Sequence, residues 1–210
     1  MLDPGVMPSH ISRGSRTPAA GQEPIEVPPW ASLFGLFYSR AGIRFPRLTR
    51  LKGPQLPQPY RSLLAHSRDM TPTLEQFYRR TLGITVIGRV LEGNAYLREV
   101  TLNLDGENRP IAYGAIRIFM DHFPPHAQEM IREEHCPLGK ILELEEIPHV
   151  GWPQAFFRVA PDAHMASMLQ LKAPRKLYGR RNVLLDGDRR LLAEVLEVLA
   201  PAQTPENANR

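Results

Sequence analysis

Apolar and polar residues alternate along several stretches of the chain between residues 84 and 200, a pattern typical of half-buried β-strands. Turn signals at Gly93-Asn94, Asp105-Gly106 and Asp186-Gly187 join neighbouring stretches, so that consecutive strands are expected to pair antiparallel. The predicted strands are ITVIGRVLEG (84–93), AYLREVTLNL (95–104), RPIAYGAIRIFM (109–120), QAFFRVA (154–160) and the two halves of NVLLDGDRRLLAEVLEVLA (182–200).

Other stretches have the end signals of helices. They are PYRSLLAHSRDM (59–70), TPTLEQFYRRTLG (71–83), PPHAQEMIREEH (124–135) and DAHMASMLQL (162–171). Thr71 and Asp162 are the expected N-caps and Gly83 the expected end of the second helix, whereas GKILEL (139–144) is expected to be a short strand or turn. The pattern predicts the α+β class, an antiparallel β-sheet of about six strands with flanking helices.

Prolines separate the start of the chain from this regular part, because ten of the 21 prolines lie within the first 60 residues. We therefore predict a proline-rich, basic N-terminal arm over 1–59 that is largely disordered. Within it, WASLFGLFYSR (30–40) is apolar and is expected to dock on the domain as a short helix. The domain itself is expected over 60–201, and 202–210 as a disordered tail.

Charge and composition narrow the range of partners. The formal net charge of +4 belongs to the first 60 residues, since the remainder carries 19 basic and 19 acidic side chains. The basic residues are spread out without a nucleic-acid-binding motif, so we expect no nucleic-acid partner. The start has no signal-peptide pattern and no stretch is apolar enough to span a membrane. We expect a cytoplasmic protein with no membrane partner; its oligomeric state is open, with a monomer favoured.

Common catalytic and metal-binding motifs do not occur in the sequence. His122 and His126 have the i, i+4 spacing of zinc ligands on a helix, but the two prolines between them break that helix. The single cysteine, Cys136, is expected to be a buried, inert thiol. The sequence thus predicts no metal and no cofactor.

Four short segments resemble, in the same order and at comparable spacing, segments of the chorismate pyruvate-lyase family. They are DMT (69–71), YLREV (96–100), CPLGKIL (136–142) and YGRRNVLLDG with LLAEVLEVLAP (178–201). The resemblance implies a six-stranded antiparallel sheet with an enclosed site. It also implies a cofactor-free carbon–oxygen lyase, which eliminates pyruvate from chorismate, an enolpyruvyl acid, to leave the aromatic 4-hydroxybenzoate.

The resemblance also assigns site residues. Arg98 would bind the ring carboxylate, for which a bidentate guanidinium is suited, and would point inward while Glu99 points outward. Met70 and Leu138 would contact the ligand. Arg180 and Arg181 match the paired arginines of the family, and one of them would help to hold a second carboxylate; Arg117 is a further candidate without motif support.

The catalytic glutamate has two candidates. Counting from Gly187 indicates Glu194, which we favour, and counting back from Pro201 indicates Glu197. The two are three residues apart, so a regular strand sends them to opposite faces of the sheet. A non-enzymatic alternative also stands, a small-molecule (aromatic acid) binding domain of the same fold, as in the effector domains of transcription regulators.

Overall fold

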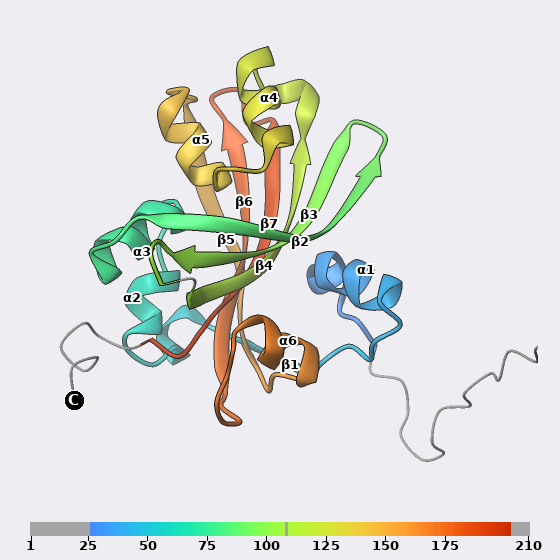
Figure 1. Cartoon of the computed structure of the whole chain (residues 1–210), viewed down its shortest axis with the longest axis vertical. Coiled ribbons are helices and arrows are strands. Elements are labelled where there is room, and N and C mark those ends of the chain that lie inside the picture. The colour runs from blue at the N-terminus through green and yellow to red at the C-terminus, as the bar shows by residue number, and fades with distance from the viewer. Residues whose placement is uncertain (1–25, 108, 203–210) are drawn as a thin grey trace, which may run out of the picture.

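A computed structural model of the chain describes residues 26–107 and 109–202, and it contains one antiparallel sheet of seven strands. Their order across the sheet is β1-β5-β6-β7-β4-β3-β2 (Figure 1). The strands are β1 (Leu48–Leu51), β2 (Leu82–Glu92), β3 (Ala95–Leu104), β4 (Arg109–Phe119), β5 (His149–Val159), β6 (Leu177–Asp186) and β7 (Leu191–Leu199). The predicted α+β class is confirmed, with β1 in addition to the predicted strands.

Helices cover both faces of this sheet. The α-helices are α1 (Ser32–Arg40), α2 (Tyr60–Leu64), α3 (Met70–Tyr78), α4 (Pro125–Glu133), α5 (Leu138–Leu144) and α6 (Ala163–Met168), and the 3₁₀ turns are η1 (Pro29–Ala31), η2 (Gly53–Gln55) and η3 (Met120–His122). In Figure 1, α4 and α5 lie together at one end of the molecule, and α2 lies beside α3. None of the helices in the described part of the chain is long and apolar enough to cross a membrane.

Three local predictions differ from the structure. Residues 138–144 form α5 and not a strand or turn, because Leu138, Ile141 and Leu142 recur at helical spacing and bury one face. Asp69 and not Thr71 precedes α3, and the left-handed residue that ends this helix is Arg79, before the predicted Gly83. The predicted N-cap at Asp162 is confirmed, since its carboxylate accepts a hydrogen bond from the backbone N–H of Met165 at 2.9 Å.

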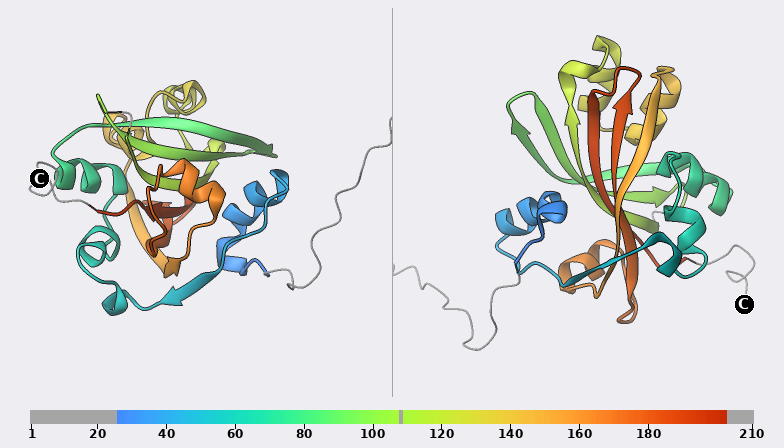
Figure 2. Two further views of the ribbon diagram at one scale, coloured as in Figure 1. Left: turned by 60° about the horizontal axis from the view of Figure 1, so that its bottom comes forward. Right: turned by 180° about the vertical axis from the view of Figure 1, so that it is seen from behind.

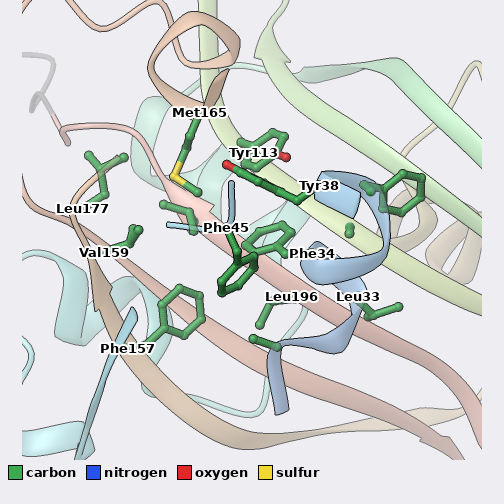
Figure 3. Close-up of a cluster of buried hydrophobic side chains, with 14 of the residues drawn as sticks. Leu33, Phe34, Tyr38, Phe45, Tyr113, Phe157, Val159, Met165, Leu177 and Leu196 are labelled. Carbon is green, nitrogen blue, oxygen red and sulfur yellow. The ribbon is translucent and has the colours of Figure 1, made fainter. Parts of the chain in front are cut away.

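One apolar layer joins α1 and α6 to the sheet. The apolar segment within 30–40 forms α1, whose Phe34 stacks on Tyr113 of β4 with ring centroids 5.2 Å apart. Figure 3 shows these rings together with Tyr38, Met165 and Phe157 in a single cluster. Since burial of such a cluster is the main favourable term in folding, α1 is part of the folded domain.

The boundary predicted at residue 60 falls inside the folded unit. β1 pairs with β5 through Leu48–Leu51, and α1 packs on β4 and β7, although both precede that position. Figure 2 shows α1 against the sheet on a different side from α2 and α3. The expected disorder of the first residues and of the C-terminal tail concerns 1–25 and 203–210, which lie outside the described residues.

The opposite face of the sheet carries two further apolar layers. One is formed by α4 and α5 with the ends of β4, β6 and β7, and the other by α2 and α3 with the opposite ends of β2, β4 and β7. The start of α3 and the start of α5 meet between these layers. A cavity lies beneath them.

Candidate functional site

The cavity lies between the sheet and the first residues of α3 and α5 and is partly open to solvent. Its empty space is about 670 Å³, including the opening to solvent. The floor consists of residues of β2, β3, β4, β6 and β7, and the roof includes Met70 and Leu138. Most of the lining is apolar, and its buried polar exceptions are Thr71, Arg98, Arg180, Asn182 and Glu197. This composition is that of a small-molecule site with few orienting polar groups.

Arg98 is a buried cation in this apolar setting, with 1% of its surface exposed. Its Nη1 and Nη2 lie 3.5 Å from the carbonyl oxygens of Ile131 and Cys136, at the long limit for a hydrogen bond, and its buried Nε has no hydrogen-bond partner. Burial lowers the pKa of the guanidinium, whereas Tyr96, Glu134 and Cys136 act in the opposite direction. Arg98 thus points inward, as predicted, and part of its hydrogen-bonding capacity is unused.

Arg180 is also buried, but its donors are occupied. Its Nε donates to Oε1 of Glu197 at 2.7 Å, and its two Nη atoms donate to the carbonyl oxygens of Leu64, His66 and Arg68 at 3.0–3.3 Å. Arg180 therefore holds the segment between α2 and α3 against the sheet. It lines the cavity, and its hydrogen bonds are made within the protein and not left for the second carboxylate that the resemblance implied.

The two candidate glutamates lie on opposite faces of β7. Glu197 lines the cavity, whereas Glu194 lies on the reverse face, where it accepts hydrogen bonds from Arg117 at 3.1 Å and from Arg181 at 2.7 Å. The favoured Glu194 is thus outside the cavity, and so are Arg181 and Arg117. The physical reason is the alternation of strand side chains, which places residues 195, 197 and 199 on the cavity side.

Glu99 was expected to face solvent, but it is buried on the reverse face with 6% of its surface exposed. The hydroxyl of Tyr113 donates a hydrogen bond to Glu99, and Nε2 of His164 lies 3.2 Å from the same carboxylate oxygen. Beside them, the Tyr38 hydroxyl donates to Asp162 at 3.0 Å. The sequence contains only a weak signal for this polar cluster. The cluster is buried because α1 and α6 cover this face of the sheet, whereas strand alternation alone predicts that the face is exposed to solvent.

Two helix starts are held together above the cavity. A Cβ atom added to Gly139 of α5 would meet Oγ1 of Thr71 in α3 at 3.0 Å, so the Thr71 side chain packs directly against the backbone of Gly139. Asp69, at the start of α3, lies 2.8 Å from Nε2 of His149 in β5. This hydrogen bond raises the pKa of the His149 imidazole, against the smaller opposing effect of burial.

The sequence singled out two histidines at the spacing of zinc ligands and a single cysteine. His122 lies 2.9 Å from the carbonyl oxygen of Leu191 and His126 lies 2.8 Å from Glu145, so these two histidines have separate partners. Cys136 is partly buried and is a free thiol. Within the described ranges, no three His, Cys, Asp or Glu side chains are grouped so that they could hold a metal ion.

Comparison with known proteins gives matches among solved structures. No family model and no curated protein matches the sequence. The effector domain of PhnF from Mycobacterium smegmatis is 15% identical with a TM-score of 0.46, over 63% of this chain and 88% of that domain. The ligand-binding domain of a candidate GntR-family transcriptional regulator from Bordetella bronchiseptica is 13% identical with a TM-score of 0.46. The match covers 58% of this chain and 87% of that domain.

The C-terminal domain of the histidine utilization repressor from Pseudomonas syringae pv. tomato is 9% identical with a TM-score of 0.39, over 60% of this chain and 93% of that domain. Two of these three structures are domains of proteins described as a transcriptional regulator and a repressor, and the third is an effector domain. The predicted carbon–oxygen lyase has no counterpart among these three structures, and we withdraw that prediction. The similarity concerns the arrangement of the strands, and it assigns no ligand.

Proposed function

We propose that this chain is a non-catalytic domain that binds a small organic acid, of which aromatic acids are the favoured class, in the cavity beneath α3 and α5. The observation that carries the proposal is Arg98. Among the described residues no carboxylate lies within ion-pair distance of this guanidinium, which is buried at the cavity wall; Glu134 acts on it only through its charge, from farther away.

The energetics of burial support an anionic ligand. Removing a charge from water costs several kcal/mol unless a partner of opposite charge and further hydrogen bonds compensate. Arg98 has two long contacts to carbonyl oxygens and an unused Nε. A carboxylate is the complement that a planar guanidinium binds most specifically, because two parallel hydrogen bonds can form.

The apolar lining supports a ligand with an apolar body. Ile116, Val195 and Leu184 contribute side chains to the cavity between its polar groups. When a flat hydrocarbon ring packs against such a floor, each Å² of apolar surface removed from water contributes about 25 cal/mol of favourable free energy. The carboxylate then determines the orientation of the ligand.

Titration calorimetry with benzoate, 4-hydroxybenzoate and neutral benzamide tests the proposal, with Arg98→Met as the decisive variant. We expect the acids to bind and benzamide to bind at least about tenfold more weakly, since hydrogen bonds to charged groups contribute about 1.5–3 kcal/mol. Arg98→Met should abolish binding of the acids. Its unfolding free energy without ligand should equal or exceed that of the wild type, because a buried cation that has no ion-pair partner is removed.

Arg117→Met is the matched control. Arg117 lies on the reverse face and pairs with Glu92 and Glu194, so its loss should leave the affinity for the acids unchanged. Failure of every acid to bind, or binding that survives in Arg98→Met, would contradict the proposal. The expected absence of a nucleic-acid partner stays a prediction.

A further inference from the structure

One row of four residues crosses the cavity floor from Arg98 to Asn182. Arg98 of β3 lies opposite Ile116 of β4. Ile116 lies opposite Val195 of β7, and Val195 lies opposite Asn182 of β6. Since neighbouring strands are about 4.8 Å apart, the ends of this row are three strand spacings apart on the same face. The row has a cation at one end, two apolar side chains in the middle and an amide at the other end.

The amide end has an unused acceptor. Asn182 is buried, with 2% of its surface exposed, and its Oδ1 has no hydrogen-bond partner within the described part of the protein. A buried amide oxygen without a partner costs about 1–3 kcal/mol, so such atoms are rare unless a bound group satisfies them. Asn182 lines the cavity, where a bound molecule can reach it.

The adjacent row makes this end still richer in acceptors. Glu197 lies opposite Arg180 in the next row, and it also lines the cavity. Arg180 directs its hydrogen bonds to Glu197 and to three backbone carbonyl oxygens, so the cation is engaged with the protein. The groups that the protein offers to a ligand here are an amide oxygen and a carboxylate. Both favour a hydrogen-bond donor on the ligand.

We infer that Asn182 is a specificity-determining residue that accepts a hydrogen bond from an N–H or O–H group at the end of the ligand opposite its carboxylate. The ligand class is therefore a carboxylic acid with an apolar, preferably flat middle and a donor at its far end. This inference rests on the proposed function, since Arg98 must hold the acid group. It adds a second contact that distinguishes acids of equal size from one another.

Isosteric ligand pairs test the inference. A methyl group has nearly the volume of a hydroxyl or amino group but cannot donate, so 4-hydroxybenzoate and 4-aminobenzoate are compared with 4-methylbenzoate, and 3-hydroxybenzoate with 3-methylbenzoate. For at least one pair we expect the donor-bearing acid to bind wild-type protein about tenfold or more tightly, the size of effect that an unsatisfied buried polar group produces.

Asn182→Leu is the decisive variant, because leucine has a similar shape and no polar atom. It should remove the preference within the pair, and the methyl acid should bind at least as tightly as it binds the wild type. Asn103→Leu is the control: Asn103 is also buried, but its amide donates to Thr85 at 2.9 Å and it does not line the cavity. That variant should keep the preference.

The outcomes separate this inference from the proposed function. If the acids bind through Arg98 but the wild type does not distinguish the pairs, or if Asn182→Leu keeps the preference, the role of Asn182 is refuted and the acid site stands. If none of the acids binds, the proposed function itself fails. Melting of both variants without ligand verifies that they are folded, and Asn182→Asp, which keeps an acceptor, should keep the preference for the donor.

Discussion

Arg98 and Glu99 are consecutive residues of one strand, and both are buried on opposite faces of the sheet. The two charged groups differ in how fully the protein satisfies their hydrogen-bonding capacity. Glu99 accepts a hydrogen bond from Tyr113 and lies beside His164, so the protein itself satisfies it. Arg98 has an unused Nε, and that difference supports the acid site that we propose on the cavity face.

The Arg180–Glu197 pair shows the structural use of charge at the same scale. Replacing Arg180 with methionine leaves Glu197 buried without its cation and frees three carbonyl oxygens, so we expect a loss of about 3–5 kcal/mol in the free energy of unfolding. Urea denaturation measures it. Arg181→Met is the control: Arg181 is the next residue and its pair with Glu194 is more exposed, so the expected loss is about 0–1 kcal/mol. Equal losses of unfolding free energy in the two variants would show that Arg180 does not stabilise the fold through these contacts.

At the scale of elements, the start of α3 is tied to β5 by Asp69 and His149. Both ring nitrogens of His149 face acceptors, since Nδ1 lies 2.7 Å from the carbonyl oxygen of Ile147 and Nε2 lies 2.8 Å from Asp69. Only the imidazolium can donate from both nitrogens, so the folded state favours the charged form. This contact joins the roof of the cavity to the edge of its floor.

The pH dependence of this contact has a definite sign. The pKa of His149 is raised in the folded protein, so its contribution to stability is fully present below the unfolded value of 6.5 and is lost as the pH rises through the folded value. The difference in unfolding free energy between wild type and His149→Asn should therefore shrink as the pH rises from about 6 to about 9. Asp69→Asn should weaken the same pH dependence. A difference that is constant over this range would show that the imidazolium is not the stabilising form.

At the scale of the whole molecule, the reverse face of the sheet is covered by a segment that lies far from it in the sequence. Phe34 of α1 is fully buried and stacks on Tyr113 of β4, which donates to Glu99. The apolar segment of 30–40 is therefore a structural layer of the domain. It also contributes to the buried surroundings of the Glu99 carboxylate on that face.

Removing this layer should destabilise the entire domain. Phe34→Ala is expected to lower the free energy of unfolding by about 3–5 kcal/mol, since a large aromatic side chain leaves a cavity in the core. Ser39→Ala, on an exposed position of the same helix, should change it by less than about 0.5 kcal/mol. A cooperative loss seen by both circular dichroism and tyrosine fluorescence would place α1 in the folding unit. Unfolding of α1 alone, with the sheet intact, would contradict it.

The sequence by itself determined the features that depend on near neighbours. Alternation and turn residues were sufficient for most of the strands and for their antiparallel pairing, and with them the α+β class. The inward direction of Arg98 followed from the segment resemblance, and Met70, Leu138 and Arg180 of the same set also line the cavity. The lyase activity implied by that resemblance did not stand, because fold and site segments carry no information on whether a reaction follows binding.

Only the tertiary structure decided which glutamate of β7 lines the cavity together with Arg98, and that Glu99 is buried. The alternation of side chains along a strand predicts that Glu194 and Glu197 point to opposite faces of the sheet. Which of these faces holds the cavity depends on where α3 and α5 pack. Likewise, whether a strand has one covered face or two depends on helices that are distant in the chain. Local patterns reflect the chemistry of adjacent residues, whereas burial is set by contacts among all elements at once.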